Sequence, residues 1–260
     1  MPLLFDSHCH LDVAEFNADR DAVLARARAA GVCLQLLPAI DAAGWPALRD
    51  LCAATPGLHP AFGLHPLFMD RHRPAHLKAL RDWLQRERPV AVGECGLDFW
   101  TGNDDAPAQM ALFEGQLRLA REFDLPVVLH ARKALDAVIA ALRRTGGLRG
   151  VVHSFSGSPQ QARQLWDLGF HLGIGGPVTY PRARRLRALV ADMPANWLLL
   201  ETDSPDQPPC GCQGRRNEPA RLAQVVLEVA MLRNEPPDAL AATTTANACR
   251  LFGLPVPDQA

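Results

Sequence analysis

The sequence predicts an α/β fold, a single (β/α)8 barrel of the TIM type with additional C-terminal helices. Short apolar runs alternate with amphipathic stretches along the whole 260-residue chain. The runs are continuous rather than alternating in polarity, which is typical of parallel strands covered on both faces. Eight such pairs follow one another without a long linker, and this favours a barrel over a doubly wound sheet. We therefore expect residues 1–260 to form one domain.

The individual elements follow from these runs in chain order. The expected strands cover residues 3–5, 32–38, 59–63, 90–93, 127–129, 150–152, 170–174 and 197–200. The expected helices between them cover residues 20–30, 42–54, 75–88, 106–123, 135–144, 159–168 and 182–191. Pro89, Pro126 and Gly150 stand just before strands, where each ends the preceding helix. Two closing helices are expected at 219–233 and 237–252.

The charges of the chain nearly cancel, with 27 Lys and Arg against 28 Asp and Glu. This balance excludes a protein that binds nucleic acid through an overall basic excess, but not an enzyme that holds its substrate briefly. The first residues lack the basic and apolar regions of a signal peptide, and no run reaches the roughly 18 apolar residues of a membrane span. The seven cysteines lie mostly in apolar segments. We expect a reduced, cytoplasmic, monomeric protein without membrane contact.

Residue types that bind metals follow five of the expected strands. Asp6, His8 and His10 alternate at the first, so their side chains are expected on one side of an extended strand. The other four strands run into Glu94, His130, His153 and residues 201–203. Each residue alone is compatible with a polar loop position. The carboxyl ends of barrel strands meet on one face, however, and together the residues exceed the ligands that one zinc ion takes. Two metal ions that share a carboxylate explain the set better.

Six segments carry a resemblance to a known family. In chain order they read DSHCHLD, GLHP, AVGECGLDFW, LPVVLHAR, VVHSFSGS and LLLETDSP. They resemble the successive motifs of the TatD family of metal-dependent deoxyribonucleases, which belongs to the amidohydrolase-like superfamily. Two further segments, GGPVTYPRA and QGRRNEP, are similar to the YjjV-type branch. The resemblance covers most of the chain in the right order and implies a metal-dependent hydrolase domain.

The resemblance also implies a ligand set. His8, His10 and Asp203 would hold one divalent metal ion, His130 and His153 would hold a second, and Glu94 would bridge the two. Each of these positions carries the expected residue type. The chain departs from the family at Cys95 and at Phe99-Trp100, where relatives often have an aliphatic residue and tyrosines. The second departure leaves the substrate contacts of that loop open.

The implied activity is hydrolysis of phosphodiester bonds in DNA, with RNA as an open alternative, by a 3′-5′ exonuclease that prefers single-stranded ends. Two metal ions about 3.5–4 Å apart would clamp the phosphodiester and activate a water as nucleophile. Asp203 is the expected general base. Asp203 and Glu94 are therefore the expected catalytic residues.

Three further residues are expected to contact the substrate. His65 stands on the loop that carries GLHP, Arg132 offers a fork suited to phosphate, and Arg215 follows the eighth strand. For Arg132 a structural ion pair is the alternative.

Two other functions remain open from the sequence. An amidohydrolase-like barrel could hydrolyse a C–N or ester bond in a small molecule. Many such enzymes bridge their metals with a carboxylated lysine after the fourth strand, and Glu94 in that place argues for the nuclease. The second alternative is a metal-binding partner protein without turnover. The sequence does not choose among zinc, manganese, magnesium, nickel and cobalt, nor between exonuclease and endonuclease action, and it leaves the protein partners and biological role open.

Overall fold

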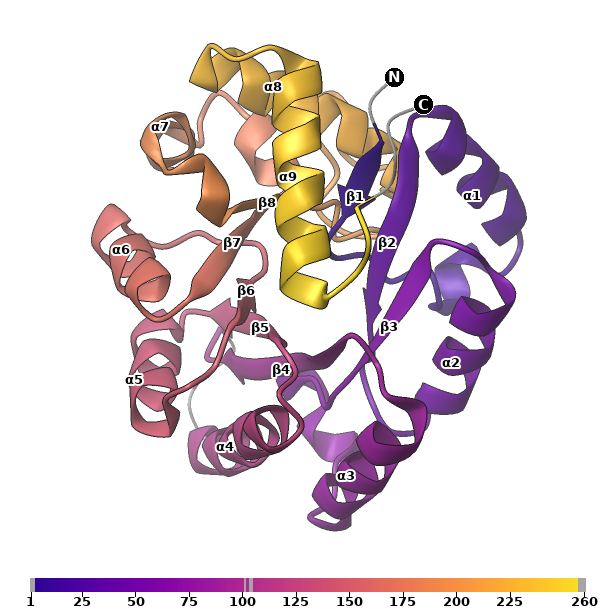
Figure 1. Ribbon diagram of the computed structural model, residues 1–260, viewed down its shortest axis with the longest axis vertical. Helices are drawn as coiled ribbons and strands as arrows, with labels where there is room; N and C mark the ends of the chain where they lie inside the picture. The colour runs from indigo at the N-terminus through magenta and orange to yellow at the C-terminus, as the bar shows by residue number, and fades with distance from the viewer. Residues whose placement is uncertain (1–2, 101, 103–104, 257–260) are drawn as a thin grey trace.

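Eight parallel strands form the centre of the computed structural model, which describes residues 3–100, 102 and 105–256. They pair in sequence order from β1 to β8 in one sheet that curls into a nearly closed barrel (Figure 1). The strands are β1 (Leu4–Asp6), β2 (Val32–Pro38), β3 (Leu58–Phe62), β4 (Ala91–Asp98), β5 (Val127–Arg132), β6 (Gly150–Val152), β7 (Phe170–Ile174) and β8 (Leu198–Leu200). The predicted (β/α)8 barrel is confirmed.

Helices follow the strands in alternation and surround the barrel (Figure 1). They are α1 (Arg20–Ala29), α2 (Trp45–Ala54), α3 (Ala75–Glu87), α4 (Ala106–Glu122), α5 (Leu135–Thr145), α6 (Pro159–Asp167), α7 (Arg184–Asp192), α8 (Leu222–Arg233) and α9 (Pro237–Phe252). The expected helix at 219–233 begins as a short 3-10 turn, Pro219–Arg221, before α8. The expected helix at 42–54 begins later, at Trp45.

The largest difference from the predicted strands lies at β4 and β5. Both continue past their apolar runs, so Glu94 and His130 lie inside strands rather than after them. The extension is stabilised by strand pairing, in which Gly96 pairs with His130 and Asp98 with Arg132. Polar residues hide such an extension from a search for apolar runs.

Hydrogen bonds beyond the strand ends join the first and last strands. The N–H of Ser7 donates to the Leu200 carbonyl over 3.0 Å, and the N–H of Asp203 donates to the His8 carbonyl over 2.9 Å. The carboxylate of Asp6 is buried and accepts from both the N–H and the hydroxyl of Thr202, at 2.9 and 2.6 Å. Asp6 therefore fastens β1 to the segment after β8. It does not share one strand face with the two histidines as expected, because β1 ends at Asp6.

Helix α9 closes the barrel at the amino ends of the strands. Inward-facing residues of seven strands form one apolar cluster with four residues of α9; the cluster contains Phe5, Leu36, Ala61, Ala91, Val128, Val151, Leu199, Ala248, Cys249, Leu251 and Phe252. In Figure 1 this helix crosses in front of the barrel. The opposite end, where the strands terminate, is left for polar side chains.

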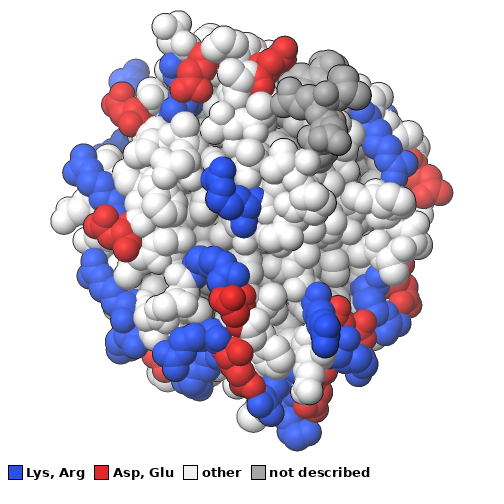
Figure 2. Space-filling model, in the orientation of Figure 1, with Lys and Arg blue, Asp and Glu red and all other residues white. Residues whose placement is uncertain are grey.

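Basic and acidic side chains are interspersed around the edge of the face that carries α9 (Figure 2). Mixed signs of this kind agree with the formal net charge of −1. Among the described helices, none has the length and apolarity needed to cross a membrane.

The α9 closure predicts a stability difference between two leucines. Leu251 is 5% exposed in the barrel cluster, whereas Leu227 on α8 is 59% exposed. Leu251→Ala should lower the free energy of unfolding by about 2–5 kcal/mol, because it leaves a cavity in the core. Leu227→Ala should change it by less than about 0.5 kcal/mol. Chemical denaturation of both variants measures the difference, and equal effects would contradict the role of α9.

Candidate metal centre

Six of the residues singled out in the sequence meet at the carboxyl ends of the strands. Glu94 and His130 lie in the neighbouring strands β4 and β5, and the others follow β1, β6 and β8. The side chains that converge are His8, His10, Glu94, His130, His153 and Asp203, and all of them except His8 line one cavity of about 740 Å3. The parallel barrel thus brings together residues separated by almost 200 positions.

Glu94 is the centre of this cluster. Its Oε2 atom lies 3.1 Å from His8 Nε2 and 3.5 Å from His10 Nε2. Its Oε1 atom lies 3.0 Å from His130 Nδ1 and 2.8 Å from His153 Nε2. Each carboxylate oxygen therefore faces a different pair of the predicted imidazole ligands, which is the arrangement that a bridging ligand requires.

Asp203 completes the side of the cluster that carries His8 and His10. Its Oδ1 atom lies 3.6 Å from His8 Nε2 and 3.8 Å from His10 Nε2. The amide of Gln207 donates to the other carboxylate oxygen, Oδ2. Burial raises the pKa of Asp203, although the charges of nearby histidines act in the opposite direction.

The donor set fits metal ions better than it fits hydrogen bonds alone. Nε2 of His8 lies 3.1 Å from Nε2 of His10, and Nδ1 of His130 lies 3.2 Å from Nε2 of His153. Oε2 of Glu94 is buried without a hydrogen-bond partner among the described residues. Several lone-pair donors aimed at a common space form a ligand shell, since neutral imidazole and carboxylate bind divalent cations.

The ionisation of the cluster reflects burial and the charge of Glu94. Burial raises the pKa of this carboxyl, but its electrostatic interactions with His65, His153 and His8 outweigh burial and hold the pKa well below its usual range. Burial also lowers the pKa of His10 and His153, yet their interaction with Glu94 raises the values to about 9 and about 10. Glu94 and the imidazoles of His10 and His153 thus stabilise each other's charged forms.

His65 lies deeper than the substrate contact expected for it. It is 6% exposed, and its Nε2 atom lies 2.9 Å from Oε1 of Glu94. Its Nδ1 atom accepts a hydrogen bond from the N–H of Leu67 over 3.1 Å. A neutral His65 therefore carries its proton on Nε2 and donates it to Glu94. In this tautomer His65 orients the carboxylate.

The two expected arginine contacts occupy different environments. Arg132 lies at the end of β5, is exposed and lines the cavity. Its guanidinium stands 4.2 Å from the ring centre of Trp100, a cation–π contact in place of the expected alternative of an ion pair. Arg215 is exposed in the segment after β8 and is not among the residues that line the cavity.

Asp98 is a site residue that the sequence analysis missed. It is 2% exposed, and its Oδ2 atom lies 2.7 Å from Nε2 of His130. A carboxylate that accepts a hydrogen bond from one imidazole nitrogen fixes the other nitrogen toward a metal. Alternation along β4 was the available signal, because residues 94, 96 and 98 share one face of a strand.

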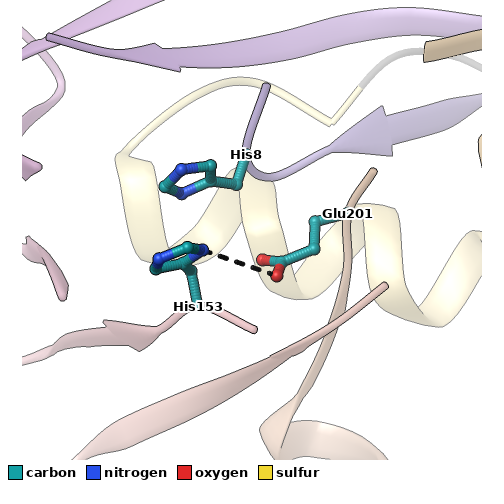
Figure 3. A group of neighbouring side chains, drawn as sticks. All are labelled: His8, His153 and Glu201. Carbon is teal, nitrogen blue, oxygen red and sulfur yellow. Dashed lines mark ion pairs between the residues drawn. The ribbon is translucent and has the colours of Figure 1, made fainter. Parts of the chain in front are cut away.

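Glu201 is a second carboxylate at the cluster, and the sequence analysis gave it no role of its own. It is fully buried, and its Oε1 atom accepts from the N–H of Ser154 over 2.5 Å and lies 3.8 Å from Nδ1 of His153 (Figure 3). The His8 ring stacks on His153 with 3.9 Å between ring centres. Burial raises the pKa of Glu201 to about 8. Glycine at position 173 leaves room for the Oε2 atom of Glu201, because a Cβ at that position would lie only 2.1 Å from it.

A buried carboxylate among histidines at the carboxyl end of a (β/α)8 barrel is typical of metal-dependent hydrolases, and the comparisons place the chain in this class. The profile of the family described as TatD related DNase matches residues 5–253. The chain belongs to this TatD-related DNase family.

Relatives of known sequence match over nearly the whole chain. The uncharacterized metal-dependent hydrolase YjjV of Escherichia coli K12 is 41% identical, with 96% of this chain and 98% of the relative covered. A Klebsiella pneumoniae protein named 3′-5′ ssDNA/RNA exonuclease TatD is 37% identical, with 97% and 99% covered. The crystal structure of the E. coli YjjV protein has a TM-score of 0.92 at 40% identity and covers 97% of this chain and 98% of its own.

Asp98 gives a prediction about metal affinity. Asp98→Asn should weaken divalent metal binding by about 10–100-fold, because His130 loses the negative charge that orients its ring. Titration of the metal-free protein by calorimetry measures the affinity. Asp167→Asn, an exposed substitution on α6, is the matched control and should leave the affinity unchanged. A folded Asp98→Asn protein with unchanged affinity would exclude this function of Asp98.

Proposed function

We propose that this hydrolase cleaves phosphodiester bonds of single-stranded DNA or RNA from the 3′ end with two divalent metal ions bound around Glu94. The observation that carries the proposal is the position of Glu94, whose two oxygens face two separate pairs of imidazoles. A relative named as a 3′-5′ ssDNA/RNA exonuclease, 37% identical over nearly the whole chain, supports the choice of substrate.

The proposed ligand sets follow from the carboxylate oxygen that each residue approaches. His8 and His10 lie on the side of Oε2 and are joined there by Asp203. His130 and His153 lie on the side of Oε1 and form the second proposed set. Sets rich in imidazole suit zinc, manganese, nickel or cobalt, and magnesium prefers oxygen ligands. Metal ions in these sets would lower the pKa of a water and neutralise charge on the phosphate.

The chain's own residues then supply proton transfer and orientation. Asp203 lies at the cavity with one oxygen held by Gln207, which leaves Oδ1 to accept a proton from the attacking water. Because burial raises its pKa, Asp203 is a better proton acceptor than an exposed aspartate. His65 holds Glu94 in place, and Arg132 at the cavity lining can pair with the phosphate through its fork.

We also infer that residues 1–260 act as one domain in a reducing compartment. All seven cysteines lie among the described residues and are free thiols, and five of them are buried: Cys9, Cys52, Cys95, Cys212 and Cys249. Free buried thiols are typical of cytoplasmic proteins.

The substrate class is tested by an assay of the metal-loaded protein on single-stranded DNA, duplex DNA and RNA, with and without a chelator. We expect cleavage of 3′-labelled single strands that the chelator abolishes. Asp203→Asn should lower the rate by about 10²–10⁴-fold, because the proton acceptor is lost. The exposed Asp192→Asn on α7 is the control and should retain the wild-type rate. Chelator-insensitive cleavage, or hydrolysis of a small amide or ester alone, would overturn the proposal.

Metal uptake should release protons. In the metal-free protein the pKa values of about 9 for His10 and about 10 for His153 mean that both rings are protonated at pH 7.5. Because imidazole binds metal only when neutral, apparent affinity should rise as pH rises toward these values. Calorimetry in buffers of different ionisation enthalpy should count about two protons released on saturation. His10→Asn should remove about one of them, and a count near zero would contradict the ligand assignment.

A further inference from the structure

We propose that a second cavity beside the metal centre is a subsite for a neighbouring nucleotide of the substrate strand. Its base would stack on the Trp100–Arg132 pair, and its backbone phosphate would bind Lys133 and Arg132. The inference rests on the proposed phosphodiesterase activity and extends it, because it assigns a position to a nucleotide that is not being cleaved.

The second cavity has a volume of about 570 Å3 and is continuous with the lining of the first. Arg132, Ser154, Phe155 and Ser156 belong to the walls of both. Its volume lies within the range of ordinary small-molecule sites, about 300–1,000 Å3. The shared residues place the two cavities side by side, so a strand with one phosphodiester at the metal centre could extend an adjacent nucleotide into the second cavity.

The chemistry of this wall suits a nucleotide. Trp100 is 55% exposed, one of the few large apolar side chains at the surface of the described chain. The Arg132 guanidinium lies 4.2 Å and the Lys133 ammonium 5.6 Å from its ring centre. Unpaired bases stack on aromatic rings and on guanidinium planes, and the two cations can bind phosphate oxygens. The acid of this cavity, Asp136, accepts a hydrogen bond from Gln161, 2.6 Å away.

Trp100 and Arg132 are also fixed relative to the metal centre. Asp98 accepts from the N–H of Trp100 through Oδ1, and its Oδ2 atom holds His130. The N–H of Phe99 donates to the carbonyl of Arg132 over 2.9 Å. The carboxylate that orients a proposed ligand therefore also holds the backbone of Trp100, so the pairing of β4 with β5 sets the distance from this backbone to the metal centre.

Binding of a fluorescein-labelled phosphorothioate octamer of deoxythymidine to the metal-loaded protein, followed by anisotropy, tests the subsite. Trp100→Ala should weaken binding about tenfold, as expected for one lost stacking contact. Lys133→Gln should weaken binding and reduce the slope of log affinity against log salt by about 0.7, as expected for one lost phosphate contact on a single strand. Lys78→Gln is the matched control, because Lys78 is an exposed lysine on α3 paired with Asp82.

Substrate length supplies a second measurement. If the subsite binds an extra nucleotide, wild-type kcat/KM should rise from a dinucleotide to a pentanucleotide, and Trp100→Ala and Lys133→Gln should flatten this rise. The subsite alone would be overturned if the wild type binds and cleaves the oligonucleotides but Trp100→Ala and Lys133→Gln behave like Lys78→Gln. The comparison covers affinity, salt slope and length dependence. A metal-loaded wild type that neither binds nor cleaves the oligonucleotides would overturn the proposed function and the subsite with it.

Discussion

The buried negative charge of Glu94 is the constraint on which the rest of the site depends. Five imidazole nitrogens lie within 3.5 Å of its two oxygens, and none of its side chain is open to bulk water. A carboxylate in such a place is stable only when it is surrounded by positive charge or hydrogen-bond donors. The requirement for compensation explains why histidines from four segments must converge on one residue of β4, and why they form a donor set suited to cations.

Two sets of contacts between strands bring these side chains together. Pairing of β4 with β5 extends to Asp98 and Arg132, and it places Glu94, His130 and Asp98 in one rigid layer. Hydrogen bonds between the segments after β1 and β8, with the Asp6 carboxylate on Thr202, place His8 and His10 beside Asp203. The amino ends of the strands are closed by the apolar face of α9. Apolar side chains thus fill one end of the barrel, and the polar side chains of the site lie at the other end.

The proposed metal ligands and the proposed nucleotide contacts lie in two different cavities. The first is lined by the proposed ligands and proton acceptor, and the second by an exposed indole with two cations. Asp98 is shared, because it holds His130 and the backbone of Trp100. The proposed polyanionic substrate is compatible with a net charge of −1, since steering depends on charge near the site rather than on the total.

The sequence by itself determined the barrel, the order of its elements, and Glu94 together with five of the side chains that gather around it. Apolar runs report burial on both strand faces, and residues at strand ends share one face of any parallel barrel. The tertiary structure alone decided the burial of His65, the separate position of Asp6, the orienting contact of Asp98 and the exposure of Trp100. Each of these depends on a partner from another strand or loop. Residue type and spacing along one segment carry no information about such a partner, whereas the pairing of strands fixes it.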